Sequence, residues 1–358
     1  MDGRVLKVMM PFFIEEFGNA SSNTHFHGSN AKKAVELATN KIAAVINSES
    51  RELIYTSGAT EAINLAIKGL YEEQKDSRNH IICLKTEHKA VLDTCKSLEN
   101  RGAKLDYVDV DQSGSVNFKQ LEEKISTDTL LVCVMFANNE TGVVQDIKRI
   151  TDLAHRKGAL FFTDATQAFG KIAINVEELG IDMLSISGHK IYGPKGIGVL
   201  YIRSGYKISE QVNGGGHQGG RRSGTLNVPA IVGLGEAAEI ALNSMEEEII
   251  RLSKMREEFE LDLVAAEKIK INGDRALRLP NISNVQLLNY LDADAFILKH
   301  KNKISISTGS ACNSEIVEAS HVLTAMGLSD DDAHKSIRIS IGRMTEDMDL
   351  IKSVILER

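Results

Sequence analysis

Short apolar runs alternate with longer amphipathic stretches from about residue 29 to residue 202. Apolar residues spaced three and four apart predict helices, and brief runs of apolar residues predict buried strands. The predicted strands are 53–55, 81–84, 105–110, 130–137, 160–163, 183–186 and 197–202. The predicted helices are 29–48, 59–73, 88–100, 117–125 and 145–157. Repeated strand-then-helix units indicate an α/β fold with a mostly parallel sheet and helices on both faces.

The pattern changes in the C-terminal third of the chain. Residues 205–225 are rich in glycine and carry no periodic pattern, and a long helix is expected to begin near Val228. The charged stretch 245–259 is expected to include the crossing into a second domain of short strands and helices. The predicted division is a large domain of residues 15–245 and a small α+β domain of residues 1–14 and 246–358.

Lys190 has an unusual position in this pattern. It comes soon after the apolar run 183–186, and Gly193-Pro194 forces another turn before the next apolar run. Burying an ammonium group is costly unless it is paired or neutralised. A Schiff base with an aldehyde cofactor would remove the charge, and Ser187 and His189 offer hydrogen-bonding groups suited to a phosphate. A lysine that reaches solvent from a loop is the structural alternative.

Thr56-Ser-Gly-Ala-Thr-Glu61 joins a predicted strand to a predicted helix. In open parallel sheets, ligands bind beyond the carboxyl ends of the strands. Gly58 permits a tight turn, and the amides of Ala59 and Thr60 would open the helix and favour a bound phosphate. The alternative is a plain helix cap.

Asp164 ends the predicted strand before the lysine strand. A carboxylate there can face a pyridinium nitrogen and keep it protonated. A capping box with Gln167, three residues on, is the alternative. Both interpretations can hold, because they use different atoms.

Two further polar groups follow predicted strands. Asn138-Asn-Glu-Thr-Gly142 offers amides to a phenolate oxygen or a substrate carboxylate, although asparagine and glycine also suit a turn. His88 could stack on a flat ring and move protons near neutral pH. Isolated histidines are more often structural.

The composition excludes several functional classes. Hydrophobic residues make up 42% and charged residues 25% of the 358 residues, which is typical of a globular protein. A net charge of −7 and a pI near 5.9 give no basic footprint for nucleic acid. No apolar stretch is long enough to cross a bilayer and no signal peptide opens the chain, so we expect a cytoplasmic protein.

The four cysteines show neither metal-ligand spacing nor a disulfide framework. Cys83 and Cys133 lie in apolar runs and are expected to be inert core thiols, whereas Cys95 lies in a polar helical stretch. Cys312 is surrounded by small and polar residues, in a loop that could present a reactive thiolate.

In their order along the chain, these motifs resemble those of the cysteine desulfurases. The series is Ser57-Gly-Ala-Thr-Glu, Thr86-Glu-His-Lys, Asn138-Asn-Glu-Thr-Gly, Thr163-Asp-Ala-Thr-Gln, Ser187-Gly-His-Lys-Ile-Tyr-Gly-Pro-Lys-Gly, Arg222-Ser-Gly-Thr and Thr308-Gly-Ser-Ala-Cys. The resemblance is to the NifS/IscS type, runs over essentially the whole chain, and implies the fold of the class V aminotransferases, which use pyridoxal phosphate.

The resemblance implies a role for each matching residue. Lys190 would carry pyridoxal 5′-phosphate as a Schiff base, and Cys312 would take the substrate sulfur as a persulfide. The residues implied to bind the phosphate are Ala59, Thr60, Ser187 and His189, with Thr225 from the neighbouring subunit of a homodimer. Those implied at the ring are His88, Asn139, Asp164 and Gln167. Arg338 would bind the substrate carboxylate, with Asn139 close by.

The implied activity converts L-cysteine to L-alanine and passes sulfur to an acceptor such as an Fe–S scaffold protein. The chain departs from the family in two places: the usual opening strand with its Ala-Thr-Thr-Pro-like turn does not precede Met1, and Gly-Asn-Pro reads Gly18-Asn19-Ala20. Other interpretations stay open. They are a selenocysteine lyase or another enzyme of this fold, a catalytically impaired sulfur-trafficking partner lacking the N-terminal segment, and a dinucleotide-binding oxidoreductase suggested by the glycines of 214–220.

Overall fold

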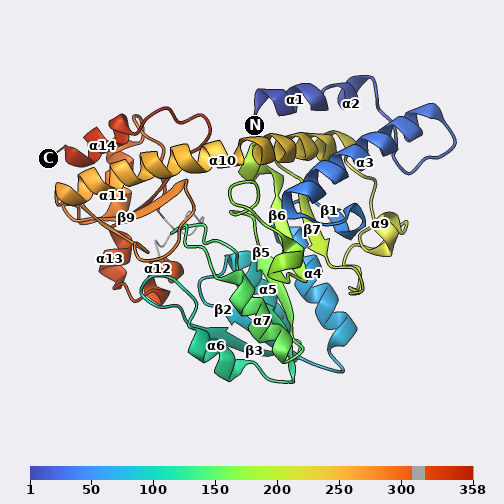
Figure 1. Ribbon diagram of the computed structural model, residues 1–358, viewed down its shortest axis with the longest axis horizontal. Helices are drawn as coiled ribbons and strands as arrows, with labels where there is room; N and C mark the ends of the chain where they lie inside the picture. The colour runs from blue at the N-terminus through green and yellow to red at the C-terminus, as the bar shows by residue number, and fades with distance from the viewer. Residues whose placement is uncertain (309–318, 358) are drawn as a thin grey trace.

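A computed structural model describes residues 1–308 and 319–357 of the chain. Figure 1 shows a larger and a smaller part joined by one long helix, α10 (Val228–Ala265). The larger part contains a seven-stranded sheet, and the smaller part contains a three-stranded sheet. Every helix of the described chain is too short or too polar to traverse a lipid bilayer.

The large sheet is the mostly parallel sheet that the sequence predicts. Its strands are β1 (Leu53–Thr56), β2 (His80–Leu84), β3 (Lys104–Val108), β4 (Thr129–Cys133), β5 (Leu160–Asp164), β6 (Met183–Ser187) and β7 (Gly198–Ile202). Their order is β1-β7-β6-β5-β4-β2-β3. The five strands from β3 to β6 in this order are parallel, whereas β7 is antiparallel to both of its neighbours. The parallel strands therefore end at one edge of the sheet.

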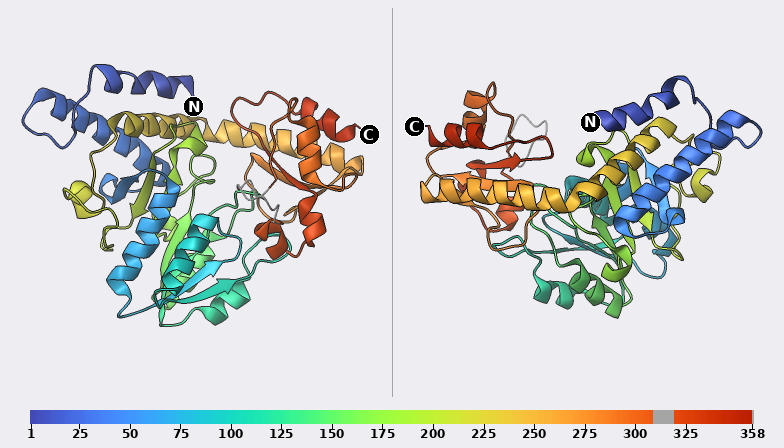
Figure 2. Two further views of the ribbon diagram at one scale, coloured as in Figure 1. Left: turned by 180° about the vertical axis from the view of Figure 1, so that it is seen from behind. Right: turned by 45° about the horizontal axis from the view of Figure 1, so that its top comes forward.

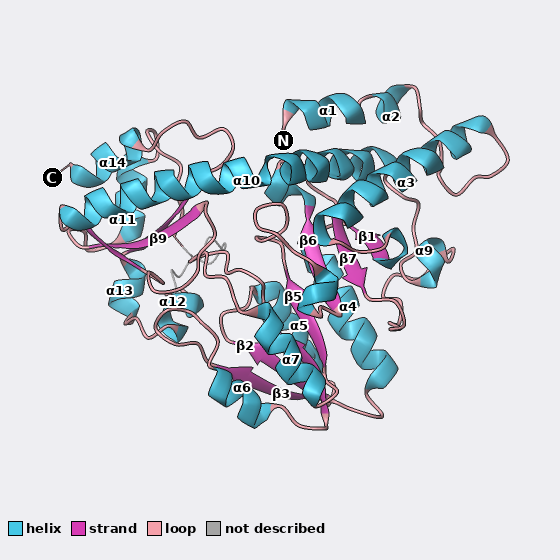
Figure 3. Ribbon diagram, in the orientation of Figure 1, coloured by secondary structure: helices cyan, strands magenta, loops and turns pink. Residues whose placement is uncertain are grey.

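Helices cover both faces of this sheet (Figure 3). Ile81 and Cys83 pack with α4 (Ala59–Gln74) and α5 (Lys89–Glu99) in one core. Ile82 and Leu84 belong to a second core that contains residues of α10. The same core includes helices α3 (Phe26–Ile46) and α7 (Ile147–Arg156). Such alternation along β2 is the two-residue period of a strand buried on both faces. The short helices of this part are η1 (Ser50–Glu52), α6 (Phe118–Lys124), α8 (Val176–Leu179) and η2 (Gly188–Ile191).

The glycine-rich stretch protects the sheet edge at β1. The side-chain amide of Gln218, in α9 (His217–Gly220), accepts a hydrogen bond from the Tyr55 N–H at 2.6 Å and donates one to the Tyr55 carbonyl at 3.0 Å. It thus satisfies two groups that a neighbouring strand would otherwise bind. A dinucleotide-binding glycine motif must follow a strand directly, and β7 ends at Ile202, so that interpretation is wrong.

The smaller part is built on an antiparallel sheet, as the predicted α+β architecture requires. Its strands, in the order β10-β9-β8, are β8 (Ile269–Ile271), β9 (Ile282–Leu287) and β10 (Ser336–Ser340). Its helices are α11 (Ala293–His300), α12 (His321–Ala325), α13 (Asp330–His334) and α14 (Asp349–Leu356). The core of this part combines the end of α10 with β9, β10 and α14.

The N-terminal helices α1 (Gly3–Met9) and α2 (Pro11–Ile14) lie along α10 (Figure 2). The Asp2 N–H donates to the carbonyl of Tyr192 at 2.9 Å, and the Asp2 carboxylate forms an ion pair with Arg343 at 3.2 Å. The segment therefore contacts both parts of the molecule. Its assignment to the small domain, and the domain boundaries at 14/15 and 245/246, stay a prediction.

Candidate active site

The strand ends of the large sheet open into a cavity of about 570 Å³. Its walls come from the turns after β1, β2, β4, β5 and β6, and from one residue of β10 in the smaller part. The predicted site residues that line it are Ala59, Thr60, His88, Asn139, Asp164, Gln167, Ser187, His189, Lys190 and Arg338. The fold thus brings together ten residues that the sequence singled out from scattered motifs.

One wall of the cavity is the N-terminus of α4. Its N-cap, Gly58, has φ 157° and ψ 179°, a conformation that is open essentially to glycine alone. Gly58 brings no capping side chain, so the first amides of the helix, at Ala59 and Thr60, remain available for an anion. The Ser187 hydroxyl and the His189 Nδ1 atom lie 2.9 Å apart on the same cavity. These donors suit a phosphate group.

Lys190 enters the cavity from η2, directly after β6. The turn ends at Tyr192, whose φ of 64° is uncommon for a residue with a side chain. A hydrogen bond of 2.8 Å from the Arg343 N–H to the Tyr192 hydroxyl supports this conformation. Desolvation lowers the pKa of Lys190, the charge of Arg338 adds to this effect, and Asp164 opposes it. A lowered pKa favours the neutral amine that a Schiff base requires.

Asp164 is held at the end of β5 through one carboxylate oxygen. Its Oδ1 atom accepts hydrogen bonds from the Thr166 N–H at 3.0 Å and from the Ser185 hydroxyl at 3.2 Å. The second oxygen is left for a partner in the cavity. The reciprocal hydrogen bonds of a capping box between Asp164 and Gln167 are not found among the described residues, where Asp164 accepts from the Thr166 N–H and the oxygen of Gln167 accepts from Lys171.

His88 is the N-cap of α5, and its Nδ1 atom accepts a hydrogen bond from the Ala90 N–H at 3.1 Å. The ring proton is therefore on Nε2, and the ring lines the cavity. Asn138 forms the turn proposed for its motif, because its oxygen accepts from the Glu140 and Thr141 N–H groups. Its neighbour Asn139 lines the cavity.

Arg338 reaches the cavity from β10. Its guanidinium donates to the Asn139 carbonyl at 3.0 Å and to the Ser307 hydroxyl at 2.8 Å. Its Nε atom is buried without a hydrogen-bond partner among the described residues. Desolvation lowers its pKa, and the charge of Glu140 opposes this effect. An under-satisfied guanidinium at a cavity wall suits the carboxylate of a small substrate.

The donor set fits pyridoxal 5′-phosphate. An anion-binding helix terminus lies in the same cavity as a lysine with a lowered pKa and a carboxylate with one free oxygen. These groups match the phosphate, the aldehyde and the ring nitrogen of that cofactor, respectively. No group of three or more histidine, cysteine, aspartate or glutamate residues that could hold a metal ion occurs within the described part of the chain.

Two predicted residues are not part of this cavity. Thr225 is exposed and lies outside the lining, and its predicted contact is with a neighbouring subunit. Cys312 lies outside the described residues. Cys83 and Cys133 are fully buried, as expected of core thiols, and Cys95 is equally buried despite its polar surroundings in sequence.

Sequence reasoning missed two residues that contact the site. Lys171 binds Gln167 at 3.1 Å, and its spacing of four residues from Gln167 was the available signal. Ser307 binds Arg338, five residues before Cys312 in sequence. No pattern distinguishes that serine from others in polar loops.

Comparisons with known proteins agree with this geometry. The family described as aminotransferase class-V matches residues 1–352. The cysteine desulfurase IscS of Neisseria meningitidis serogroup A is 45% identical over 363 residues, covering 99% of this chain and 89% of the relative. A solved NifS-like protein has a TM-score of 0.92 at 36% identity, covering 99% of this chain and 94% of the other. A structure described as SspA in complex with cysteine has a TM-score of 0.84 at 36% identity, covering 95% of each chain.

Proposed function

This chain belongs to the aminotransferase class-V family, and we infer that it is a cysteine desulfurase that carries pyridoxal 5′-phosphate on Lys190. The observation that carries the inference is the shared cavity of Lys190, Asp164 and Arg338 beside an anion-binding helix terminus. Cysteine desulfurase relatives that match nearly the whole chain support the same reaction. A solved relative in complex with cysteine supports the substrate.

The bound cofactor supplies an electron sink that makes the carbon–sulfur bond of cysteine breakable. Lys190 holds it and exchanges protons with the substrate at Nζ. Asp164 provides the negative charge that keeps the ring nitrogen protonated. Arg338 orients the substrate through its carboxylate, and the Nε2–H group of His88 can donate a hydrogen bond within the cavity.

Cys312 is the proposed sulfur acceptor. One L-cysteine and the Cys312 thiol give one L-alanine and one Cys312 persulfide, so atoms balance and no outside oxidant is required. Ser307, which precedes Cys312 by five residues in sequence, is hydrogen-bonded to Arg338, so the described chain that leads to Cys312 contacts the proposed substrate-binding arginine. Sulfur from the persulfide would serve Fe–S cluster assembly or another thiolation through an acceptor protein. Location in the cytoplasm stays a prediction.

We propose a homodimer in which Thr225 serves the partner's phosphate site. Thr225 is exposed in the single chain and therefore accessible to a second copy. Large apolar side chains near the N-terminus are exposed as well, including Phe17 at 81% and Phe26 at 69%. Such exposure is typical of an interaction surface. Light scattering on the wild type and on a Phe17→Glu, Phe26→Glu variant tests this proposal, and a monomeric wild type would contradict it.

Two variants test the reaction. Purified wild type should be yellow, and should form alanine and, with a reductant, sulfide from L-cysteine. Lys190→Ala should be colourless and inactive, whereas Lys157→Ala, an exposed lysine on the α7 side of the sheet, should match the wild type. A coloured Lys190→Ala protein would remove Lys190 as the attachment site.

Cys312→Ser should keep the yellow colour and lose sulfur release. Undiminished release would exclude Cys312 from the reaction. A wild type that binds cofactor without forming alanine would instead indicate an impaired sulfur-trafficking partner. The same assay with L-selenocysteine measures the selenocysteine lyase alternative through the ratio of the two kcat/KM values.

A further inference from the structure

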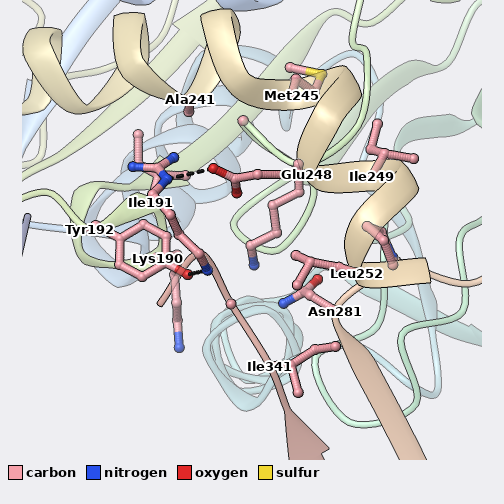
Figure 4. Close-up of a pocket in the computed structure, with 15 residues that line it drawn as sticks. Lys190, Ile191, Tyr192, Ala241, Met245, Glu248, Ile249, Leu252, Asn281 and Ile341 are labelled. Atoms are coloured by element: carbon pink, nitrogen blue, oxygen red, sulfur yellow. Dashed lines mark hydrogen bonds and ion pairs between the residues drawn. The ribbon is translucent and has the colours of Figure 1, made fainter. Parts of the chain in front are cut away.

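Lys171 is a cation beside the cofactor cavity that the reaction above does not use. It follows β5 and lines a second cavity, of about 20 Å³, on the far side of the Lys190 turn. Figure 4 shows this small cavity, with Lys190 and Tyr192 on one side and Glu248 of α10 on another. Lys171 therefore shares a cavity wall with the catalytic lysine and with the long helix.

No carboxylate neutralises Lys171 within the described residues. The acid of the same cavity, Glu248, is already bound by the guanidinium of Arg343 and by the Ser244 hydroxyl. Among the described residues, the Lys171 ammonium makes one hydrogen bond, from its Nζ atom to the Oε1 atom of Gln167 at 3.1 Å. A desolvated ammonium without an acid is costly, so its position here calls for a reason beyond packing.

The chemistry of this contact fixes the orientation of the Gln167 amide. A protonated lysine has three donors and no acceptor, so the atom of Gln167 that faces it must be the oxygen. The amide nitrogen is then on the opposite side of the side chain, and Gln167 lines the cofactor cavity. Gln167 thereby becomes a hydrogen-bond donor to whatever occupies that cavity.

We propose that Lys171 is a positioning residue that holds Gln167 as a donor to the ring oxygen of the bound cofactor and so lowers the pH at which the Lys190–cofactor linkage loses its proton. This inference rests on the proposed function, because it requires the cofactor in the cavity. The ring oxygen carries a negative charge, which a protonated linkage nitrogen partly offsets. A hydrogen-bond donor at that oxygen therefore stabilises the charge most when the linkage nitrogen has lost its proton. Removing the donor should therefore raise the midpoint of the colour change with pH.

The protonation of Lys171 is itself sensitive to its surroundings. Desolvation lowers its pKa to about 7, with smaller contributions from the charges of Lys190 and Arg338. The charged and titratable groups that line the small cavity with it are Lys190, Tyr192, Glu248 and Arg343. A neutral lysine can accept a hydrogen bond, so the constraint on Gln167 weakens as pH rises through this range.

The test is a pH titration of the visible spectrum of the cofactor-loaded protein, with bound cofactor measured separately. Lys171→Met removes the donor at similar length, and Lys171→Gln is a polar second variant in case the first does not fold. Both should raise the midpoint by about one unit while cofactor content is retained. In Lys171→Arg the guanidinium can only donate hydrogen bonds, so this variant should keep the wild-type midpoint.

A double variant separates positioning from a direct effect of charge. In a Gln167→Ala background, Lys171→Met should add no further shift, because the residue through which it acts is gone. A full shift in that background, or an unchanged midpoint in both single variants, would overturn the proposal. A colourless wild type would instead contradict the proposed function, so the two failures are distinguishable.

Discussion

The guanidinium of Arg338 donates a hydrogen bond from Nη1 to the main-chain carbonyl oxygen of Asn139 at 3.0 Å. The two residues are 199 positions apart, one on β10 of the smaller part and one in the turn after β4. This contact places the arginine over the strand ends without using all of its donors, since Nε has no partner among the described residues. The smaller part thus contributes to the cavity a guanidinium that is held in place but does not use all of its hydrogen-bond donors.

Arg338→Lys should lower kcat/KM for L-cysteine about 10- to 100-fold, mainly through KM. Lysine keeps the charge but loses the planar fork that binds a carboxylate through two hydrogen bonds, and it cannot bind Asn139 and Ser307 as Arg338 does. Steady-state alanine formation measures the effect. Arg203→Lys, at the far end of β7, is the matched control and should leave KM unchanged. An unaltered KM in Arg338→Lys would exclude it from substrate binding.

Asp164→Asn should reduce kcat on the order of 100-fold, the usual effect of losing one preorganised electrostatic partner. Asparagine retains an oxygen for the Thr166 N–H and the Ser185 hydroxyl, so the turn should persist while the charge is lost. Alanine formation at saturating cysteine is the measurement. Ser185→Ala removes only one of these hydrogen bonds and should have a much smaller effect. An equal loss of kcat in both variants would indicate that Asp164 has a structural role instead.

Glu260→Gln should destabilise the smaller part by about 3–5 kcal/mol. The Glu260 carboxylate receives two hydrogen bonds of 2.7 Å from Arg278 and one of 2.7 Å from the Ser283 hydroxyl. Both charged side chains are buried, so the amide leaves Arg278 uncompensated. Glu258→Gln, on the exposed side of the same helix, should change stability by less than about 0.5 kcal/mol. Denaturant unfolding compares the variants, and similar stabilities would contradict this role of the pair.

Lys171 should make the stability of the cofactor-free protein depend on pH. Its pKa is lowered from 10.5 to about 7 on folding, so between these values the unfolded chain binds a proton that the folded chain does not. Stability contributed by the neutral amine therefore rises with pH in this window, by up to about 1.4 kcal/mol per pH unit. Across about pH 7 to 9, wild type should gain in melting temperature relative to Lys171→Met. Parallel curves would show that Lys171 titrates normally.

The sequence predicted most of the large part, because its strands are short apolar runs followed by helical periodicity. It could not predict the direction of β7, since the run 197–202 reads like the parallel strands before it. Cys95 lies on a helix, as expected, but its polar neighbours in sequence gave no sign of its burial. With Val91 and Leu98 it forms the buried stripe of α5, at spacings of four and three residues.

The residues that line the cavity could be predicted from the sequence, because motifs that follow parallel strands come together at the edge where those strands end. The contacts that support these residues could not be predicted. The bond between Lys171 and Gln167 and the bond between Ser307 and Arg338 depend on side-chain directions that no residue pattern specifies. The partial burial of Lys171 without a carboxylate partner among the described residues is likewise a property of the folded surroundings.

Helix α10 connects the two parts of the molecule that form the active centre. Its 38 residues span about 57 Å, from contacts with α3 and the Lys190 turn to contacts with β8, β9 and α14. A bend of about 5° at its middle would displace either end by about 2–3 Å. The distance between the Lys190 amine and the Arg338 guanidinium therefore depends on the shape of α10 as well as on the direct contact of Arg338 with Asn139, and amino acid changes far from the cavity that stiffen or kink the helix should alter which substrates fit.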